Sequence, residues 1–538
     1  MTELFKRLLE QRGLGVDFLH PQYQPEYWRG QLPDIKQAVA RIKQAVEQGE
    51  KVLIYGDYDV DGVTASTILH DALQLAGVEE IEIMLPDRFK EGYGMHLSCV
   101  ERAQELKTSL VITVDCGANN EEVIAALAEA GIDVIVTDHH ELAGTVPTAV
   151  AVVDAKRPDC SCADELKELC GAGVAFMLAD ELVAAGLIPA GQEKWLLDLV
   201  MIGTICDNMV LRGLNRELCY YGFKVLEKTR RIGLKELMRV AGVKTLNTDA
   251  IGFQLGPRLN AGGRMESAEI ALQLLMTQSR AEALKLSNKL EELNGERKRV
   301  QGTAVAEVAK TGVTDEPVLV AVGENWHEGV LGIIAGRLVE QYHRPCFALA
   351  EVEDGVLKGS GRSFGDFNLA EALSECQKWL ETGGGHAGAC GVKLLMVNLP
   401  KFRQEINNYY KSLELKDQEK FLEKQEDLMV EQLEELSVEL VDELKQLEPY
   451  GIGNEEPVWL LSNVLVQETR RMGSEEQHLR LTVRDNRGKL LKLVAFYAPK
   501  EWMQLSGGEH INAWINLTGN EWNGQRSAEG RIVRLALV

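Results

Sequence analysis

Short apolar runs alternate with amphipathic segments over the first 155 residues. The apolar runs predict buried strands at Val52–Tyr55, Ile81–Leu85, Leu110–Val114, Val134–Thr137 and Ala149–Val153. Segments with helical periodicity lie before and between them, at residues 34–49, 64–76, 96–106 and 120–130. Strands that alternate with helices are typical of an α/β fold, here a doubly wound, mostly parallel sheet.

The pattern turns helical after about residue 165. Helices are predicted at 173–185, 193–205 and 217–228, and a long charged segment, Ser279–Lys310, predicts a helix that connects two domains. Strand and helix patterns return between Pro317 and Tyr410, which indicates a second α/β domain.

Short β runs dominate the C-terminal part. Five runs between Val464 and Leu537 predict a small β-barrel of the OB type, with turns at Gly507-Gly508 and Asn523-Gly524. The segment Glu414–Lys445 before them is predicted to be helical. We therefore expect five parts: an α/β domain with an N-terminal helical segment (1–278), a connecting helix (279–312), a second α/β domain (313–412), an acidic helical linker (413–456) and the barrel (457–538).

Composition narrows the class of protein. The chain has 538 residues, 45% hydrophobic and 26% charged, which is ordinary for a globular protein. No apolar run approaches the roughly 18 residues of a membrane span, and the first residues lack a signal-peptide core, so we expect a cytoplasmic protein. Ten cysteines in a chain of this length argue against a disulfide framework. Cys160, Cys162 and Cys170 lack the usual zinc spacing, which favours reduced thiols over a zinc site.

Charge is unevenly distributed. The net charge of −24 argues against a basic coat for nucleic acid, but residues 414–443 alone carry 12 acidic residues against 3 lysines. That segment is either an interaction surface or, as we favour, a solvated helix. A local nucleic-acid groove remains compatible with the total charge. The barrel carries a basic run from Arg470 to Lys492, and Trp502, Trp514 and Trp522 are candidates for base stacking.

The segment Gly56–Gly62 carries the clearest chemistry. Asp57, Asp59 and Asp61 alternate directly after a predicted strand. In an extended segment they point the same way, so we expect them to converge beyond the end of the strand and to bind a divalent metal. The alternatives are a solvated acidic turn or a calcium loop, but an EF-hand needs Glu at the twelfth position, where this chain has Ile68.

Further polar residues follow other predicted elements. Asp115 follows Leu110–Val114, Asp138-His139-His140 follow Val134–Thr137, and Asp207 ends a predicted helix. Asp115 or Asp138 alone could cap the following helix. Together they form a hard, mixed oxygen and nitrogen ligand set that suits Mn²⁺ or Mg²⁺. Two such ions about 3.5–4 Å apart would clamp a phosphoryl group.

At these residues the chain resembles the DHH phosphoesterase superfamily and, within it, the RecJ family of single-stranded-DNA-specific 5′→3′ exonucleases. Six further stretches are similar to that family: 91–94, 256–265, 326–333, 359–363, 383–386 and 449–454. The resemblance runs from about residue 34 to the end. It implies a DHH domain, a DHH-associated domain and an OB-like nucleic-acid-binding barrel.

The resemblance also implies roles for the motif residues. The positions that match the family's metal ligands are Asp59, Asp61, Asp115, His139 and Asp207, with Asp115 as the bridging ligand. Asp57 and Asp138 are ligands or orienting partners, and His140 is expected to contact the scissile phosphate or to hold a ligand. Tyr55 stands where related pyrophosphatases place a metal-binding histidine, which argues against pyrophosphate as the substrate.

Phosphate binding is expected from three further motifs. Glycine loops let backbone amides approach an anion, and arginine binds phosphate with two hydrogen bonds. The substrate-binding candidates are Arg258, Asn260, Arg264, Ser360, Arg362, Gly384, Gly385 and His386.

The resemblance implies a metal-dependent exonuclease of DNA repair and recombination that releases mononucleotides. It implies single-stranded DNA as the substrate, a single-strand-binding protein and a RecQ-type helicase as partners, and a monomer. One alternative is a phosphodiesterase of short oligonucleotides or cyclic dinucleotides, but residues 457–538 argue against it. The other is a non-catalytic DNA or replisome-binding scaffold, but the complete set of motif carboxylates argues against that.

Overall fold

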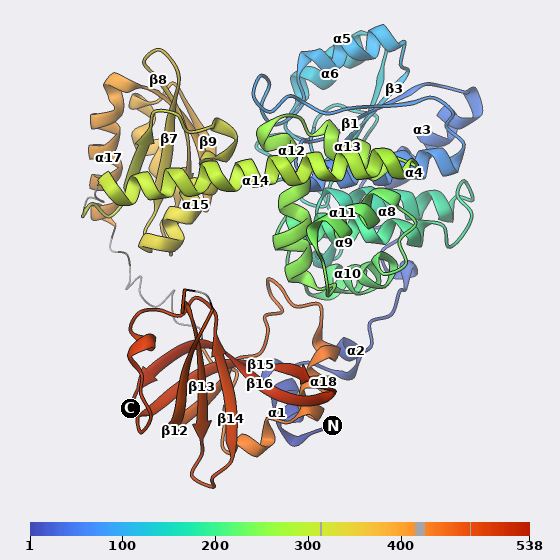
Figure 1. Ribbon diagram of the computed structural model, residues 1–538. Helices are drawn as coiled ribbons and strands as arrows, with labels where there is room; N and C mark the ends of the chain where they lie inside the picture. The colour runs from blue at the N-terminus through green and yellow to red at the C-terminus, as the bar shows by residue number, and fades with distance from the viewer. Residues whose placement is uncertain (312–314, 414, 416–424, 474) are drawn as a thin grey trace. The chain divides into compact units, whose positions relative to one another are not determined.

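The computed structural model describes residues 1–311, 315–413, 415, 425–473 and 475–538 (Figure 1). They form two compact units. One unit holds residues 24–209 and 213–415, and the other holds residues 1–23, 210–212 and 425–538. Within the described ranges, no helix is both long and apolar enough to cross a membrane.

A five-stranded parallel sheet organises the first unit. Its strands are β1 (Val52–Tyr55), β2 (Ile81–Met84), β3 (Leu110–Val114), β4 (Asp133–Thr137) and β5 (Ala151–Val153). Their order is β2-β1-β3-β4-β5, and all neighbours are parallel. The predicted doubly wound sheet is therefore confirmed. The winding direction reverses between β1 and β3, and such a switch point opens a crevice at the carboxyl ends of the strands.

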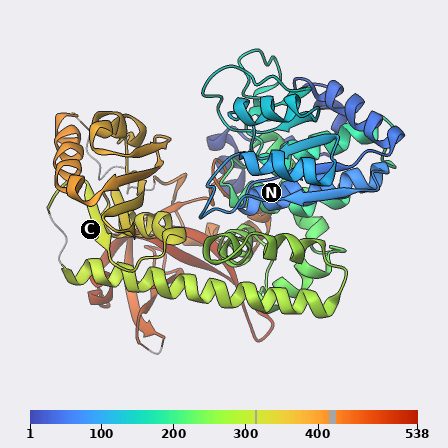
Figure 2. The ribbon, with the colours of Figure 1, turned by 90° about the horizontal axis from the view of Figure 1, so that it is seen from above.

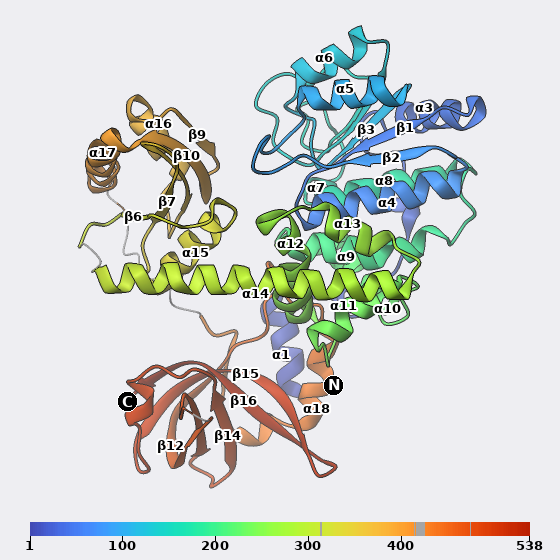
Figure 3. The same ribbon diagram turned by 45° about the horizontal axis from the view of Figure 1, so that its top comes forward.

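Helices cover both faces of this sheet. They include α3 (Ile35–Gln48), α4 (Val60–Ala76), α5 (Leu97–Leu106), α6 (Glu121–Glu129) and α8 (Gly171–Ala184). Figure 3 shows α5 and α6 on one side of the strands and α4 and α8 on the other. Cys99 and Ile124 from α5 and α6 pack onto Leu53 and Val111 of the sheet. Helices α4 and α8 bury most of their residues, as expected for helices enclosed between layers.

A helical layer begins just before α8 and ends in one long helix. Its members are α7 (Asp164–Lys167), α9 (Leu197–Cys206), α10 (Gly213–Leu226), α11 (Ile232–Ala241), a π-helical turn (Ala250–Leu255), α12 (Gly256–Met265), α13 (Glu269–Met276) and α14 (Arg280–Thr311). Figure 2 shows α14 as one unbroken helix, which confirms the prediction for Ser279–Lys310. Its first half buries Leu286, Leu290 and Leu293, and its last turns place Ala304 and Val308 in the core of the next domain.

The second α/β domain is confirmed as a mixed sheet. Its strands are β6 (Leu319–Gly323), β7 (Cys346–Glu353), β8 (Val356–Arg362), β9 (Thr382–Gly385) and β10 (Ala389–Leu395). The order is β6-β7-β8-β10-β9, with β6 and β7 parallel and the remaining pairs antiparallel. Helices α15 (Leu331–Tyr342), α16 (Leu369–Cys376) and α17 (Leu399–Ser412) complete it.

The predicted barrel is confirmed in the second unit. Its strands are β12 (Trp459–Met472), β13 (His478–Arg484), β14 (Leu490–Ala495), β15 (His510–Trp522) and β16 (Gln525–Leu537), with the short β11 (Leu428–Val430) beside β12. The order β12-β13-β14-β16-β15 closes on itself because β15 also pairs with β12. The predicted turn at Asn523-Gly524 joins β15 and β16, and both residues have the positive φ that a tight hairpin turn requires.

The N-terminal segment differs from the expectation that it accompanies the first domain. Helices α1 (Glu3–Arg12) and α2 (Val16–Leu19) belong to the barrel unit. Leu4, Phe5 and Leu8 lie in the barrel's hydrophobic core, and Arg12 forms an ion pair with Asp427 at 2.6 Å. An amphipathic pattern shows that a helix buries one face, but not which domain covers that face.

The acidic segment also differs from the expectation. Residues 414 and 416–424 lie outside the described residues. From 428 onward, β11, a short 3₁₀ turn (Leu433–Glu435) and α18 (Val438–Leu444) replace the single predicted helix, so that prediction is wrong there. Leu433, Leu436 and Leu440 lie in the barrel core, so this part is not a solvated helix.

Candidate metal centre

The loop after β1 is shorter than the alternating aspartates suggested. Helix α4 begins at Val60, and the carboxylate of Asp59 caps it by accepting hydrogen bonds from the backbone N–H groups of Asp61 (2.9 Å) and Gly62 (3.1 Å). Asp61 therefore lies in the first helical turn. The expectation that the three aspartates follow an extended segment is wrong, because local capping competes with the extended conformation.

Asp61 is fixed by a second helix. Its side chain is 2% exposed and accepts hydrogen bonds from the N–H groups of Gly171 (2.6 Å) and Ala172 (2.9 Å) at the start of α8. A Cβ at Gly171 would lie 2.5 Å from the Cβ of Asp115, so only glycine permits this approach. The sequence analysis missed Gly171, although the run Gly171-Ala172-Gly173 directly before an apolar helix was a usable signal.

The ends of β3 and β4 bring the next residues to the same crevice. Asp115 follows β3 with a left-handed backbone conformation (φ +62°), and its side chain is 4% exposed. Its Oδ1 lies 3.0 Å from His139 Nε2, directly beyond β4. His139 Nε2 also lies 3.7 Å from Asp61 and 3.8 Å from Asp207.

Asp138 orients the segment Asp138–His140 after β4, here called the DHH loop. One oxygen accepts hydrogen bonds from the backbone N–H groups of His139 (2.7 Å) and His140 (3.1 Å) and lies 2.8 Å from His140 Nδ1, while the other accepts from Ala118 N–H (2.9 Å). Burial disfavours its charge, but the hydrogen bond and charge of His140 outweigh burial and lower the pKa of Asp138. Both oxygens are thus used within the protein.

Three groups of side chains bring their donor atoms within 4.8 Å of one another. The groups are Asp57, Asp59 and Asp115; Asp61, His139 and Asp207; and Asp115, His139 and His140. Asp115 belongs to two groups, and His139 links it to the group that contains Asp207. The structure thus brings together all seven motif residues predicted for the site, but it divides Asp57 and Asp59 from Asp61.

Crowded, buried carboxylates resist ionisation in this centre. Burial, and then the charge of Asp59, raises the pKa of Asp57 well above its usual value and the pKa of Asp61 to about 6. Burial and Asp61 raise the pKa of Asp207 to about 8, and burial and its neighbouring aspartates raise that of Asp115 strongly. These carboxylates therefore need a compensating positive charge to ionise together.

The two histidines differ in their protonation. Burial and the charge of His140 lower the pKa of His139 to about 3, so His139 is neutral and its Nε2 can donate a lone pair. Burial disfavours the charged form of His140, but the hydrogen bond with Asp138 outweighs burial and raises the pKa of His140. Tyr93 Oη lies 2.9 Å from His140 Nδ1 and further fixes that ring.

The residues present fit divalent metal ions. Asp57 Oδ1 is buried and has no hydrogen-bond donor among the described residues. Five carboxylates and one neutral imidazole provide hard oxygen donors with one nitrogen donor, the set expected for Mn²⁺ or Mg²⁺. A centre of two ions with Asp115 between them agrees with its membership of two groups.

Two half-buried arginines, Arg264 and Arg362, lie near the centre, and Arg264 interacts with Asp59. Burial, and then the neighbouring Arg88, lowers the pKa of Arg264 to about 9, whereas Asp59 opposes this shift. Arg362, at the end of β8, donates hydrogen bonds to Ser360 Oγ and Gly361 O, both at 2.8 Å, and burial lowers its pKa too. Positive charges that depress one another's ionisation form a site for an anion.

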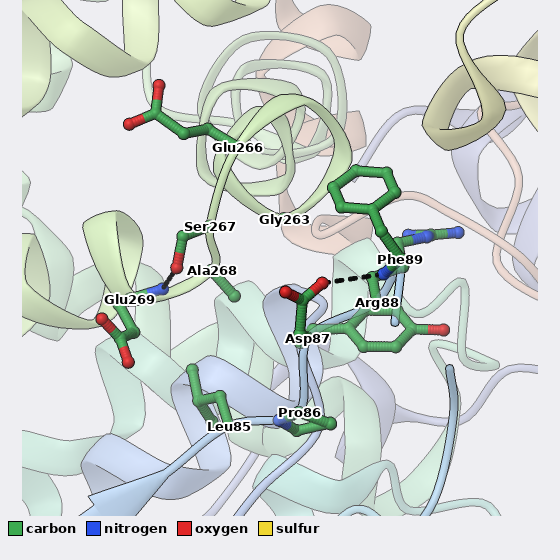
Figure 4. A pocket seen from close by; sticks show the side chains of 11 residues that line it. Leu85, Pro86, Asp87, Arg88, Phe89, Gly263, Glu266, Ser267, Ala268 and Glu269 are labelled. Atoms are coloured by element: carbon green, nitrogen blue, oxygen red, sulfur yellow. Dashed lines mark hydrogen bonds between the residues drawn. The ribbon is translucent and has the colours of Figure 1, made fainter. Parts of the chain in front are cut away.

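Arg88 is a residue that the sequence analysis missed. It lies in the loop after β2, and its guanidinium lies 4.7 Å from the centre of the Tyr58 ring. Tyr58 is the residue between Asp57 and Asp59. Figure 4 shows the pocket that this loop lines together with Gly263 and the turn 266–269. The position of Arg88 just after a strand of the parallel sheet was the signal that could have identified it.

The remaining predicted substrate residues lie in different surroundings. Arg258 is buried, pairs with Glu291 of α14 and donates to Gln254 O (2.7 Å), while Asn260 is half-buried on α12, one turn before Arg264. Gly384, Gly385 and His386 are exposed at the end of β9.

Family models match three parts of the chain. The DHH family N-terminal domain matches residues 51–204, the DHHA1 domain residues 315–412 and the RecJ OB domain residues 429–534.

Known proteins match nearly the whole chain. The proteins named single-stranded-DNA-specific exonuclease RecJ from Bacillus subtilis and Escherichia coli are 36% and 33% identical to it. These alignments cover 98% and 93% of this chain and 67% and 89% of the relatives. The crystal structure of RecJ in complex with Mn²⁺ from Thermus thermophilus is similar with a TM-score of 0.85 at 30% identity, over 98% of this chain and 75% of that one. The chain belongs to the RecJ family.

Proposed function

We propose that this protein is a metal-dependent exonuclease that degrades single-stranded DNA from the 5′ end to mononucleotides, in DNA repair and recombination. The observation that carries the proposal is the position of Asp115, which is shared by two groups of possible metal ligands near the half-buried Arg264. Relatives of this chain are named single-stranded-DNA-specific exonucleases, and one structure contains Mn²⁺.

The proposed ligands of two Mn²⁺ or Mg²⁺ ions are Asp57, Asp59, Asp61, Asp115, His139 and Asp207. Bound ions would activate a water molecule and stabilise the leaving oxygen of a phosphodiester. Neutral His139 provides a nitrogen donor, and Asp138 keeps the DHH loop in place through its three contacts to the loop. Against the effect of burial, the hydrogen bond and the charge of Asp138 raise the pKa of His140, which favours the protonated form that can contact a phosphate oxygen.

Phosphate positioning is assigned to the second α/β domain and α12. Arg264 and Arg362 supply half-buried positive charge, and Ser360 orients Arg362 by accepting its hydrogen bond. Asn260 lies one helical turn from Arg264 and shares its helix face. Gly384, Gly385 and His386 provide an exposed backbone edge with one polar side chain. Arg258 acts indirectly, by anchoring α12 to α14 through Glu291.

The barrel is proposed to bind the strand. Arg470 and Arg480 are directly opposite each other on β12 and β13, an arrangement that is unfavourable unless an anion binds. On the same sheet His478 lies 5.4 Å from Phe496 and 4.8 Å from Tyr497, and these two rings are 63% and 79% exposed. Exposed aromatic rings beside arginines favour single-stranded nucleic acid. Trp522 is also exposed, whereas Arg534 covers one face of the Trp514 ring.

The deciding experiment compares end-labelled substrates. A 5′-labelled and a 3′-labelled single-stranded 30-mer, a duplex and a dinucleotide are incubated with Mn²⁺, with Asp115→Ala as the inactive control. Early release of the 5′ label as a mononucleotide, with the duplex intact, is the expected result. Cleavage of the dinucleotide alone would instead indicate a short-oligonucleotide phosphodiesterase. Tight binding without cleavage would indicate a scaffold.

The finer assignments are part of the same proposal. They are the domain boundaries after residues 278, 312 and 412 and the barrel at 457–538, a cytoplasmic location, a monomer, and a single-strand-binding protein and a RecQ-type helicase as partners. Light scattering tests the monomer, fractionation tests the location, and pull-down with the two purified partners tests the interactions.

A further inference from the structure

The strand next to the DHH loop ends in a buried carboxylate that no step above uses. Asp154 follows β5, and Asp138 follows β4, and the preceding residues Val153 and Thr137 are paired in register. The Asp138 N–H donates to Val153 O at 3.2 Å. Asp154 is 0% exposed, and its Oδ2 has no hydrogen-bond donor among the described residues.

Asp154 fixes the start of a tight turn. Its Oδ1 accepts a hydrogen bond from the backbone N–H of Lys156 at 2.8 Å. The next residue, Arg157, donates to Val152 O (2.8 Å), pairs with Asp34, and forms a two-point contact with Asp159 at 2.9 and 2.7 Å. The turn 154–159 is therefore held at both ends by buried or paired side chains.

This turn places the ammonium group of Lys156 beside the DHH loop, next to Glu141. The side chain of Lys156 is 24% exposed, and among the described residues it forms one ion pair, a 3.7 Å contact with Glu141, which is 70% exposed. Such a long, solvated pair contributes little energy and leaves the ammonium available. Glu141 directly follows His140, so this contact places the ammonium of Lys156 beside the residues Asp138–His140.

We propose that Lys156 is a further substrate-binding residue, whose ammonium contacts a phosphate of the bound strand at the edge of the metal centre. The inference rests on the proposed function, because the anion it requires is the DNA strand. The rigid turn would keep the ammonium in place before the substrate arrives, which reduces the entropy lost on binding. Glu141 is the partner that the phosphate replaces.

The test measures how Lys156→Gln binds and digests the 30-mer at several salt concentrations with Mn²⁺. We expect KM to rise about tenfold with little change in kcat, because the contact is the same in the ground and transition states. The slope of log KM against log salt should fall by about 0.7, the value for one phosphate contact on a single strand. Lys156→Arg should restore most of the affinity, and Glu141→Gln should keep or lower KM.

A matched control separates this role from general charge loss. Lys43 is an exposed lysine of the same unit, paired with Glu47 on α3, and Lys43→Gln should leave KM and the slope unchanged. The Mn²⁺ concentration for half-maximal activity and the Tm should be the same in Lys156→Gln and the unmodified protein. Unchanged KM and slope in Lys156→Gln, or a loss explained by weaker Mn²⁺ binding or a lower Tm, would overturn the inference.

The failure of the proposed function has a different signature. If the unmodified protein does not digest the 30-mer, the proposed exonuclease is wrong. Fluorescence anisotropy of the labelled 30-mer then measures the Lys156 contact directly. A tenfold weaker Kd and the smaller salt slope in Lys156→Gln support the contact, and equal values contradict it.

Discussion

Asp115 combines three constraints that are seldom found in one residue. It has a left-handed backbone, it is almost fully buried, and it contacts Gly171 so closely that no side chain fits there. Its carboxylate is surrounded by others, and burial and the charges of neighbouring aspartates raise its pKa. A residue in such surroundings costs stability until a cation binds.

Replacing Asp115 should therefore lower activity but raise stability in the absence of metal. We expect Asp115→Asn to lose at least about 10³-fold in kcat/KM, because a shared metal ligand is removed. In EDTA its Tm should exceed that of the unmodified protein, since one repelling carboxylate is gone. Differential scanning fluorimetry and the 5′-label assay measure both effects. Asp366→Asn, at an exposed site, should change neither, and a lower Tm for Asp115→Asn in EDTA would contradict the electrostatic account.

The pH dependence follows from Asp207. Its pKa in the folded protein is about 8, raised by burial above the ordinary value, so the native state holds this proton more tightly than the unfolded chain. The stability from this proton is fully present below about pH 4 and is lost as the pH rises through about 8. In EDTA the Tm should fall between pH 6 and pH 8.5.

Mn²⁺ should remove this fall, because the metal replaces the proton. We therefore expect the Mn²⁺-induced rise in Tm to be larger at pH 8.5 than at pH 6. In Asp207→Asn the difference between the two pH values should shrink. An equal Mn²⁺ effect at both pH values in the unmodified protein would argue against a coupled carboxylate centre.

At the scale of elements, close packing between α12 and the loop after β1 sets the position of the aspartates. A Cβ at Gly263 would lie 2.7 Å from the backbone oxygen of Tyr58, which stands between Asp57 and Asp59. A backbone oxygen cannot move aside as a flexible side chain can, so the loop itself would shift. Helix α12 thus fixes a loop that is distant from it in the sequence.

Gly263→Ala should reduce kcat about 10²-fold while the protein remains folded, because displacement of a catalytic group by about 1 Å has this order of effect. The matched control is Gly302→Ala on α14, where an added Cβ meets no atom within 4 Å. That variant should gain about 0.5–1 kcal/mol of stability, since alanine favours the helix, and keep full activity. Urea unfolding and the 5′-label assay distinguish the two, and full activity in Gly263→Ala would refute the packing argument.

At the scale of the whole molecule, the chain separates chemistry from strand binding. The carboxylates and the half-buried Arg264 and Arg362 lie in one compact unit, and the closed barrel with its opposed arginines lies in the other. If the barrel binds the strand as proposed, a long substrate uses it, whereas a very short substrate depends on the metal centre alone.

The double variant Arg470→Gln/Arg480→Gln should therefore raise KM for a 30-mer and leave KM for a trinucleotide unchanged. Loss of two phosphate contacts should reduce the salt slope for the 30-mer by about 1.4. Its Tm should not fall, since two opposed like charges are removed. Lys500→Gln, an exposed residue in the same unit, is the control. Equal effects on both substrates would place these arginines outside the strand-binding surface.

The layered architecture and the chemistry of the centre follow from the amino-acid sequence alone. Hydrophobic periodicity predicts the strands of the parallel sheet, the long helix and the barrel, because burial of one face dictates which residues are apolar. The carboxyl ends of parallel strands meet at one edge of a sheet, so the sequence is enough to place Asp57, Asp115 and Asp138 together.

Contacts between distant segments determine the remaining features of the fold and of the metal centre, and such contacts exist only in the folded chain. Periodicity does not reveal the partner of a buried face, so residues 1–23 and the leucines after residue 428 were assigned to the wrong surroundings. Because Asp59 caps α4, Asp57 and Asp59 lie in one group of possible metal ligands and Asp61 lies in another. Only the packed fold showed that Gly171, Gly263 and Arg88 shape the site. These features depend on interatomic distances across the fold, which hydrophobic pattern and local motifs do not specify.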